Sequence, residues 1–578
     1  MPPDSALFRL TDRLVGRLRP GRDAGMVPLA AVIGLVAGLG AAFFRWLIET
    51  FQDLAWGEAA TPLAQFAESP AWLRLAVPAV GGLLVGLIVR YVAPETRGHG
   101  VPEVMHAVAR RGGVIRPVVA LAKSVASAIS IATGGAVGRE GPIVQIGSAL
   151  GSTFGQRLRL SARQVRTCVG CGAAAGIAAT FNAPIAGAFF AAEVILGEFG
   201  VGAFSAIVVS SVSATVVARS LLGDVPAFVI PQYSIVHPAE MLTYAVLGLL
   251  AGVAAVAFVR VLHACEDGFE RLRGVPEPVK PLLGGLAIGA IGLVMPEVMG
   301  VGYDTITDVL RGEVVWTVLV ALLVVKLLAT SLTLGSGGSG GVFAPSLFMG
   351  AALGGGVGHL ARAVFGFPMA SPGAYAVVGM GAMVAAATHA PITAILIIFE
   401  LTGDYRVILG LMASCVIGTL VAQKLQRDSI YTIKLTRRGV SLRQGREVNV
   451  LRQLRVADVV HHRMEVCHRA ATLDQLARCM AESPHYEFVV VDDDGALVGA
   501  ISMDELRRIL PHRESLGDVV IAEDLATQPM LYLREDDTLD RAMRQFGHRT
   551  HEELPVLPAG ESMVPVGVIG RQDVINAY

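Results

Sequence analysis

The sequence predicts an all-α domain that crosses a membrane many times and contains an inverted internal repeat, followed by a smaller α/β tail. Three observations support this fold class. The 578-residue chain is 53% hydrophobic and only 16% charged, with a mean hydropathy of +0.58, which is too apolar for a soluble protein of this size. One part of the chain resembles another at a fixed offset. From about residue 456 onward charges become frequent and apolar runs become short.

The apolar runs predict helices that span a bilayer. Five runs contain no charged residue and come near the roughly 20 residues that a spanning helix needs: Val27–Phe44, Val201–Ala218, Met241–Val259, Pro281–Pro296 and Val407–Gln423. Three longer runs contain Gly and Pro, so each is expected to hold more than one short helix: Thr167–Ala192, Leu327–Ala361 and Ala363–Phe399. We expect ten or more membrane segments, all helical, because lipid offers the backbone no hydrogen-bond partner.

The ends of the chain and its charge suggest a location. Residues 1–26 carry five arginines before the first apolar run, namely Arg9, Arg13, Arg17, Arg19 and Arg22. By the positive-inside rule we expect both termini in the cytoplasm and the protein in the inner (plasma) membrane, with no cleaved signal. The net charge of −1 argues against a nucleic-acid partner. The close pair Cys168 and Cys171 lies in an apolar run, where helix packing explains it better than metal or redox chemistry.

An internal repeat divides the membrane domain. Residues 123–151 align without gaps on residues 326–354, an offset of 203, and ten of the 29 positions are identical. These are Lys123/Lys326, Ala126/Ala329, Gly134/Gly337, Gly135/Gly338, Gly138/Gly341, Pro142/Pro345, Gly147/Gly350, Ala149/Ala352, Leu150/Leu353 and Gly151/Gly354. Further on, Pro184/Pro391 and Glu193/Glu400 match at an offset of 207. We therefore expect a duplicated domain over 27–440, with halves of about 27–222 and 238–440, and duplicated transporter folds often place their halves in opposite orientation.

The glycine-rich turns of the two halves predict an anion site. Gly134–Gly141 and Gly335–Gly341 each lead into a helix marked by Pro142 or Pro345, because proline suits a first helical turn. A helix N-terminus presents free N–H groups and the positive end of the helix dipole. Two such ends that converge near the middle of the membrane would hold an anion without a full positive charge, and weakly enough to release it.

Two charged residues lie inside the first turn. An ionisable side chain at such a depth is costly and by default functional. Glu140 is a carboxylate placed where an anion would bind, so it can compete for the same N–H groups and step aside when protonated. Its counterpart in the second half is Phe343, so only one half carries this gate. A structural ion pair with Arg139 is the alternative for Glu140, and Arg139 itself fits either direct anion contact or a role in setting the local field.

Four motifs in this order resemble the CLC family of chloride channels and proton-coupled chloride transporters over about residues 27–440. They are GHGVPE at 98–103, GREGP at 138–142, GGVFAP at 340–345 and DSIYTIKLTRRG at 428–439. The resemblance implies an inverted repeat of tilted helices and a homodimer with one pore per subunit. It also implies that chloride or a similar small anion is transported and that Glu140 is the gating glutamate.

The resemblance also implies a set of anion-binding residues. The backbone amides of Val342 and Phe343 would face the anion, beside Gly138 and Arg139, and the hydroxyl of Tyr431 would complete the site. Many family members have a serine in the first motif where this chain has His99. A neutral imidazole can donate one hydrogen bond to an anion, but it can equally turn away and cap the backbone. Both interpretations stay open, and the anion selectivity with them.

A second departure concerns protons. In proton-coupled members the helix after the N-A-P motif usually ends in two adjacent acids, and the second one relays protons to the gate. This chain has Glu193 followed by Val194, which cannot carry a proton. Val194 favours a channel, and a chloride/proton antiporter is the alternative, because some exchangers manage without that acid. Fluoride-exporting relatives typically lack the proline of GREGP and the tyrosine, and this chain has both.

The tail contains a repeat of its own. ATLDQLARCM at 471–480 recurs as DTLDRAMRQF at 537–546, an offset of 66, and an Asp-rich turn at Asp492–Gly495 predicts a hairpin in the first copy. The copies resemble a pair of CBS domains, at 456–512 and 518–578 after a linker at 441–455. Nucleotide-binding CBS domains often use a hydroxyl residue and an aspartate three positions later. The first copy offers Ser502 with Glu505 and the second offers Gly570 with Asp573, so adenine-nucleotide binding and a purely structural tail are both open.

Two other classes of protein are disfavoured. A magnesium transporter with a CBS tail should line its pore with carboxylates, and the N–H-rich turns with Arg139 show the opposite pattern. An intramembrane hydrolase needs a nucleophile beside a base, and His99 and His389 have no serine or cysteine at a recognisable spacing. We expect no enzymatic activity, no resident metal and no required cofactor.

Overall fold

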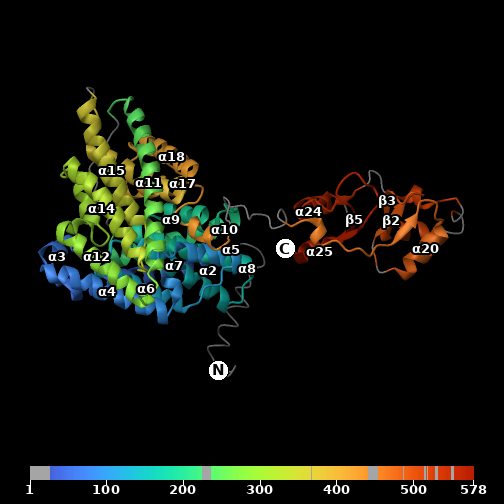
Figure 1. Cartoon of the computed structure of the whole chain (residues 1–578), viewed down its shortest axis with the longest axis horizontal. Coiled ribbons are helices and arrows are strands. Elements are labelled where there is room, and N and C mark those ends of the chain that lie inside the picture. The colour runs from blue at the N-terminus through green and yellow to red at the C-terminus, as the bar shows by residue number, and fades with distance from the viewer. Residues whose placement is uncertain are drawn as a thin grey trace, which may run out of the picture. The chain divides into compact units, whose positions relative to one another are not determined.

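The computed structural model describes residues 26–223, 236–365, 368–440 and 454–577, except for short gaps at 484, 486, 513–515, 517–518, 527–530 and 549–551. The five N-terminal arginines and most of the predicted linker at 441–455 lie outside the described residues. The chain forms two compact units, Met1–Gly445 and Arg446–Tyr578, which are helical and mixed α/β respectively (Figure 1).

The membrane unit consists of two successive sets of corresponding helices. In the first half the described helices are α2 (Met26–Trp56), α3 (Pro62–Glu68), α4 (Ala71–Tyr91), α5 (Val101–Arg110), α6 (Val118–Ala132), α7 (Glu140–Arg157), α8 (Ala162–Phe181), α9 (Pro184–Phe190) and α10 (Val201–Leu222). In the second half they are α11 (Glu240–Arg271), α12 (Lys280–Val294), α13 (Tyr303–Arg311), α14 (Trp316–Gly335), α15 (Phe343–Val364), α16 (Pro372–Thr388), α17 (Pro391–Thr402) and α18 (Ile408–Leu425). The short α19 (Thr432–Arg437) follows.

The lengths of these helices confirm a protein that crosses the membrane many times. Eight helices in the described part of the chain are long and apolar enough to span a bilayer, and four shorter apolar helices accompany them. Each of the three long runs breaks where Gly or Pro predicted a break, giving α8 with α9, α14 with α15 and α16 with α17. Half-length helices of this kind place polar helix ends inside the protein, where other parts of the chain can satisfy them.

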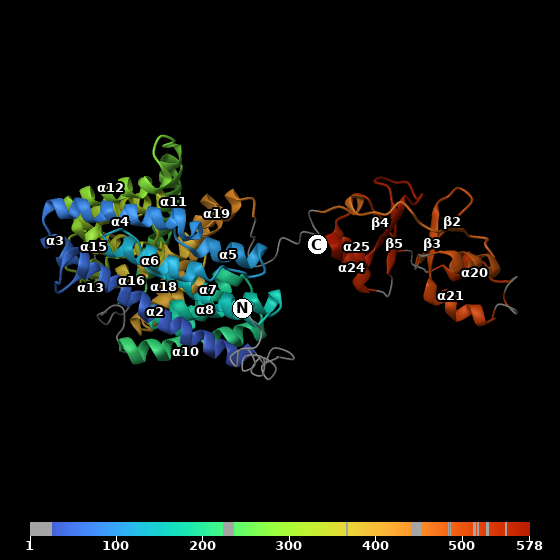
Figure 2. The ribbon, with the colours of Figure 1, turned by 90° about the horizontal axis from the view of Figure 1, so that it is seen from below.

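A local twofold axis relates the two halves. The N–H of Gly138 donates to the carbonyl of Gly341 at 2.8 Å, and the N–H of Gly341 donates to the carbonyl of Gly138 at 2.6 Å, in an antiparallel bridge. Because these residues are counterparts in the sequence repeat, the reciprocal bonds require a twofold relation at this point. Counterpart helices also pack on each other, α4 on α12 and α9 on α17, and Figure 2 shows the first pair side by side. The inverted repeat is therefore confirmed.

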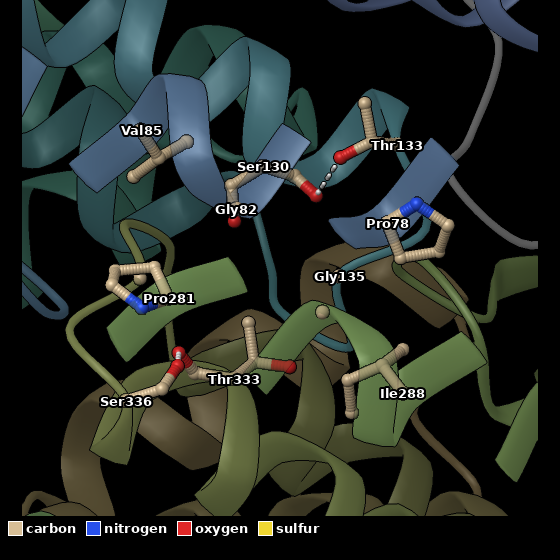
Figure 3. Close-up of a pocket in the computed structure, with 12 residues that line it drawn as sticks. Pro78, Gly82, Val85, Ser130, Thr133, Gly135, Pro281, Ile288, Thr333 and Ser336 are labelled. Carbon is tan, nitrogen blue, oxygen red and sulfur yellow. Dashed lines mark hydrogen bonds between the residues drawn. The ribbon is translucent and has the colours of Figure 1, made fainter. Parts of the chain in front are cut away.

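A small cavity of about 20 Å³ lies on this axis (Figure 3). Its twelve lining residues form six pairs of counterparts, each 203 positions apart: Pro78/Pro281, Gly82/Gly285, Val85/Ile288, Ser130/Thr333, Thr133/Ser336 and Gly135/Gly338. Four of the twelve carry hydroxyl groups, and the cavity has room for about one water molecule. The symmetry of the lining shows that the offset found in the sequence holds for α4 and α12 as well.

The repeated lysines form hydrogen bonds with the turns that precede α5 and α13. Lys123 of α6 and Lys326 of α14 are both completely buried. Each ammonium group donates to backbone carbonyls of the equivalent turn: Lys123 to Thr96 at 2.9 Å and Gly98 at 2.7 Å, and Lys326 to Val298 and Gly300, both at 2.9 Å. Irregular backbone inside a membrane protein needs such internal partners. The identical lysines in the two halves therefore have a structural cause.

The repeated glycines allow neighbouring helices to touch. A Cβ atom on Gly147 of α7 would lie 2.1 Å from the carbonyl oxygen of Gly172 in α8. In the second half a Cβ atom on Gly354 of α15 would lie 2.1 Å from the carbonyl oxygen of Tyr375 in α16. Small residues spaced four apart commonly permit such close packing in membranes. Buried Cys168 and Cys171 lie on the same crowded helix α8, where Cys168 contributes a carbonyl close to Gly151.

The tail contains two copies of one small unit. Each copy has a three-stranded sheet whose first pair of strands is parallel and whose second pair is antiparallel. The strands are β1 (Val466–His468), β2 (Glu487–Val491), β3 (Leu497–Ser502), β4 (Leu533–Arg534), β5 (Glu553–Leu557) and β6 (Gly567–Gly570). The main helices are α20 (Leu473–Glu482), α21 (Met503–Ile509), α24 (Leu539–His548) and α25 (Arg571–Ala577). The tail repeat is thus confirmed.

The two copies share one core. Val489 and Leu497 of the first sheet pack with Leu557 and Val568 of the second. Val456, the first residue of the first copy, packs into the core of the second copy, while the short helix α23 (Ala522–Leu525) packs into that of the first. The predicted hairpin turn is also present, because the carboxylate of Asp492 accepts the N–H groups of Asp494 and Ala496 at 3.0 and 2.8 Å.

The contact at Gly354 gives a stability prediction. We expect Gly354→Ala to lower the thermal unfolding temperature of the detergent-solubilised protein, because the methyl group would collide with the α16 backbone. Gly356→Ala in the same helix is the matched control, since no atom lies within 4 Å of a Cβ there. Alanine has a helix propensity better than that of glycine by about 1 kcal/mol, so the control should be neutral or slightly stabilising. Equal unfolding temperatures for the two variants would contradict the packing argument.

Candidate anion-binding site

The N-termini of α7 and α15 meet at the twofold axis. The helices begin at the counterparts Glu140 and Phe343, so Pro142 and Pro345 each stand third in the helix. Among the described residues, the N–H groups of Gly141, Val342 and Phe343 have no protein acceptor. A helix start that leaves N–H groups unsatisfied is suited to bind an anion. The structure therefore brings together the two predicted helix ends.

The carboxylate of Glu140 occupies part of this site. The side chain is 1% exposed. One oxygen accepts the Tyr303 hydroxyl at 2.5 Å, and the other accepts the N–H of Ala344, in the first turn of α15, at 3.3 Å. A Cβ atom on Gly138 would come within 2.2 Å of the carboxylate. The N–H of Gly138 donates to Gly341, so Gly138 leaves space for the carboxylate but offers the site no free N–H, and its contact with an anion stays a prediction.

Arg139, the residue before Glu140, lines a larger cavity. Its guanidinium lies 5.2 Å from the centre of the Tyr303 ring, in a cation–π contact. Both residues line a cavity of about 140 Å³ whose lining also includes Glu49, Glu297 and Asp304. The carboxylate of Glu140 bonds to Tyr303 and Ala344 and forms no ion pair with Arg139 within the described residues. This arrangement favours the gate interpretation of Glu140 over the structural ion pair.

His99 and Tyr431 form the other side of the site. Their rings lie 5.6 Å apart between centres, and each residue is 2% exposed. Nδ1 of His99 is buried without a hydrogen-bond partner among the described residues. A Cβ atom on Gly141 would lie 2.4 Å from the His99 carbonyl oxygen, so the pair sits against the start of α7. Tyr431 lies in the turn directly before the short helix α19.

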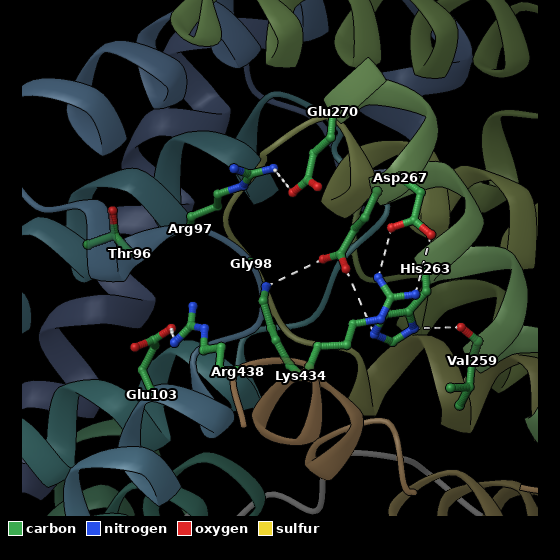
Figure 4. A network of polar contacts seen from close by, with 12 residues as sticks. Thr96, Arg97, Gly98, Glu103, Val259, His263, Asp267, Glu270, Lys434 and Arg438 are labelled. Carbon is green, nitrogen blue, oxygen red and sulfur yellow. Dashed lines mark hydrogen bonds and ion pairs between the residues drawn. The ribbon is translucent and has the colours of Figure 1, made fainter. Parts of the chain in front are cut away.

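Ion pairs hold α19, and Tyr431 with it, against α11 and α5 (Figure 4). Three contacts do this: Lys434 of α19 to Glu266 at 3.4 Å, Arg437 of α19 to Asp267 at 2.8 Å, and Arg438, which directly follows α19, to Glu103 at 2.7 Å. A single exposed pair of this kind stabilises a protein by about 0–1 kcal/mol. Three pairs that reach two different helices fix the orientation of a six-residue helix, and therefore the direction from which Tyr431 enters the site.

The acids that follow the N-A-P motif at Asn182–Pro184 and its counterpart at His389–Pro391 have a structural role in both halves. Glu193 lies in a π-helical turn, Ala191–Leu196, and accepts the N–H of Thr393 at 2.7 Å and its hydroxyl at 2.6 Å. Glu400 accepts the N–H groups of Ile185 and Ala186 at 3.0 and 2.7 Å. Glu193 of the first half thus caps the N-terminus of α17 in the second half, and Glu400 of the second half caps the N-terminus of α9 in the first. Val194, the next residue, is 7% exposed and has no titratable group.

The predicted nucleotide-binding residues of the tail are engaged within it. Ser502 and Glu505 form a capping box at the start of α21, in which the carboxylate accepts the N–H of Ser502 at 3.0 Å. Asp573 accepts the N–H of Gly570 at 2.9 Å and lies 3.1 Å from the His461 imidazole. A nucleotide that used these groups would have to displace those contacts.

Sequence reasoning missed Tyr303. The signal was present in the repeat, because GHG at 98–100 corresponds to GVG at 300–302 at an offset of 202. That alignment makes Tyr303 the counterpart of Val101. Each is the first residue of its helix, α13 and α5 respectively. We also found no reason in the sequence for the completely buried lysines beyond their repetition.

Comparison with known proteins agrees with these features. The family model of voltage-gated chloride channels matches residues 81–423, and the CBS domain model matches 456–512 and 522–578. A putative ClcB-like chloride channel protein of Ralstonia nicotianae is 38% identical over 419 residues, which are 71% of this chain and 97% of that protein. The ClC-type chloride channel ClcB of an Escherichia coli strain is 34% identical, over 70% of this chain and 97% of its own length.

Solved structures share the fold. A slow cyanobacterial Cl⁻/H⁺ antiporter is similar with a TM-score of 0.65 and 27% identity, over 72% of this chain and 97% of that one. A eukaryotic CLC transporter, with a TM-score of 0.63 and 22% identity, covers 97% of this chain and 98% of its own and so shows the likeness in fold of the tail as well. With its paired helix ends, the buried carboxylate of Glu140 between them and its tandem tail, the chain belongs to the CLC family of chloride channels and transporters.

Proposed function

We propose that this protein is a chloride channel in which Glu140 gates a path between His99, Tyr431 and the starts of α7 and α15. The observation that carries the proposal is the bond from the Ala344 N–H to the Glu140 carboxylate. In it a carboxylate stands at a helix N-terminus that would otherwise attract a mobile anion. Chloride would displace the side chain, or enter when the carboxylate is protonated and no longer competes. Val342, Phe343, Tyr431 and His99 would then supply the hydrogen bonds.

The choice of a channel over an antiporter rests on Val194 and Glu193. Proton coupling needs a group that can carry a proton at a position that anions do not use. Val194 has no such group, and the Glu193 carboxylate is committed to capping α17. The relatives divide on this point, since two are described as chloride channels and the cyanobacterial one as a Cl⁻/H⁺ antiporter. The antiporter is the alternative proposal.

The setting of the protein follows from its bacterial relatives and from the arginine-rich start of the chain. We infer an inner-membrane homodimer with both termini in the cytoplasm. Adenine-nucleotide binding by the tail stays a prediction, and the capping contacts of Ser502, Glu505 and Asp573 support a structural role instead.

The gate predicts the behaviour of Glu140→Ala. In proteoliposomes loaded with chloride, we expect wild-type efflux to rise as the pH falls, because protonation weakens the gate's hold on its N–H partner. Glu140→Ala should conduct at least as fast as the wild-type protein at every pH, with less than about twofold change between pH 5 and 8. Glu58→Ala, at an exposed loop position, is the control and should behave as wild type. A pH dependence that survives in Glu140→Ala would contradict the assignment.

Val194 predicts the absence of proton coupling. A chloride gradient is imposed across the same vesicles while chloride efflux and external pH are recorded together. We expect chloride to move without any uphill movement of protons. Uphill proton pumping that disappears in Glu140→Ala would show an exchanger with a different internal proton route, and the argument from Val194 would then be wrong.

The unpartnered Nδ1 predicts a role for His99 in anion binding. His99→Ala should weaken chloride binding about tenfold, measured by isothermal titration calorimetry in detergent, because a hydrogen bond to an anion contributes about 1.5 kcal/mol. His106→Ala, on the adjacent helix α5, is the control. An unchanged dissociation constant together with a lower unfolding temperature would instead support the alternative, in which His99 caps the backbone.

A further inference from the structure

We propose that Tyr303 is a latch for the gate: its hydroxyl holds the Glu140 carboxylate in the blocking position and sets how readily the path opens. The inference rests on the proposed gating by Glu140 and concerns a residue outside the predicted anion ligands. Tyr303 is a positioning residue, because it acts on the anion only through Glu140.

The hydrogen bonds of the carboxylate are unequal. The bond from Tyr303 is 2.5 Å long, whereas the bond from the Ala344 N–H is 3.3 Å long. An O–H donor at this distance from an ionised carboxylate belongs to the strong, charge-assisted class of hydrogen bonds. Of the two donors, the tyrosine therefore makes the greater contribution to holding the side chain. An open gate has to lose this bond first.

The surrounding structure directs the hydroxyl at the carboxylate. Tyr303 is the first residue of α13 and follows Gly302, whose φ of +87° suits glycine. Lys326 fastens the preceding turn through the Gly300 carbonyl, as described above. On the other side the Arg139 guanidinium lies over the Tyr303 ring. Lys326 of the second half thus fixes the backbone before Tyr303, and Arg139 of the first half covers its ring. Together they direct the hydroxyl toward Glu140.

The latch also stands between the gate and the cavity of about 140 Å³. Tyr303 and Arg139 line that cavity, and Glu140 does not belong to its lining among the described residues. Tyr303 therefore contacts both the carboxylate and the cavity. Its hydroxyl binds an ionised carboxylate more strongly than a protonated carboxyl group, which is a weaker acceptor. Removal of the hydroxyl should release the gate without changing the shape of the path.

A double-mutant cycle in proteoliposomes tests the latch, with chloride efflux measured at pH 7 for the wild-type protein, Tyr303→Phe, Glu140→Ala and the double variant. Tyr303→Phe keeps the ring and its cation–π contact with Arg139 but loses the hydroxyl, which donates to Glu140 and also contacts the Arg139 side chain. We expect it to raise efflux about tenfold, the change that the loss of one hydrogen bond to a charged group implies. In the Glu140→Ala background the same substitution should change efflux by less than about twofold, because no carboxylate is left to hold.

Tyr244→Phe is the matched control. Tyr244 is a buried tyrosine of α11 that stacks on Tyr375, and its hydroxyl has no hydrogen-bond partner in the described part of the chain. Its efflux should equal that of the wild type, and size-exclusion profiles should show that all variants are equally well folded.

The outcomes separate the latch from the gate. An effect of Glu140→Ala without any effect of Tyr303→Phe would keep the gate and overturn the latch. Equal effects of Tyr303→Phe with and without Glu140 would also overturn it, because the tyrosine would then act on the anion path itself. Wild-type efflux in Glu140→Ala, at every pH, would show that Glu140 is not the gate, and the latch would be wrong with it.

Discussion

The pair of hydrogen bonds between Gly138 and Gly341 is the constraint on which the rest of the membrane unit depends. It joins the two glycine turns back to back, so that the helices that follow them start at one point. Backbone inside a bilayer has to find its partners within the protein. Each turn finds some of these partners in the opposite half, because the carbonyl of Ala136 accepts the Thr330 hydroxyl at 2.8 Å and the N–H of Gly340 donates to the carbonyl of Gly98 at 3.3 Å.

The backbone of the site is symmetric, but the side chains at counterpart positions differ. The N–H groups of helix starts are supplied by both halves, but the proposed gate occurs once, since Glu140 corresponds to Phe343. His99 corresponds to Val301, and Tyr303 corresponds to Val101. One anion bound near a twofold axis needs one competitor. A second carboxylate at position 343 would lie beside the first, and two like charges in one site disfavour each other's ionised form. The two halves therefore share the helix starts and differ in the side chains that surround them.

The sequence predicted the parts of the fold that packing dictates. Glycines at helix contacts, lysines under the turns and the Asp-rich hairpin each satisfy a local requirement, so their patterns could be found without coordinates. The pairing of Glu193 with Glu400 was visible as a match, but a match cannot show that each carboxylate caps the other half. Contacts made by single side chains across long stretches of chain were out of reach. Tyr303 meets Glu140 over 163 positions, and the N–H of Gly138 proved to be taken by a residue 203 positions away.

The position of the remaining acids bears on how protons reach the gate. The carboxylate oxygens of Glu193 and Glu400 accept N–H groups at helix starts of the opposite half. Protonation of either carboxylate would weaken these caps and so the contact between the two halves. The carboxylates of Glu49, Glu297 and Asp304 line the cavity beside Tyr303, and one oxygen of Glu297 is buried without a hydrogen-bond partner among the described residues. Under the proposed gating, a proton that reaches Glu140 from this cavity would open the path without being exchanged for the anion, which is the behaviour of a channel.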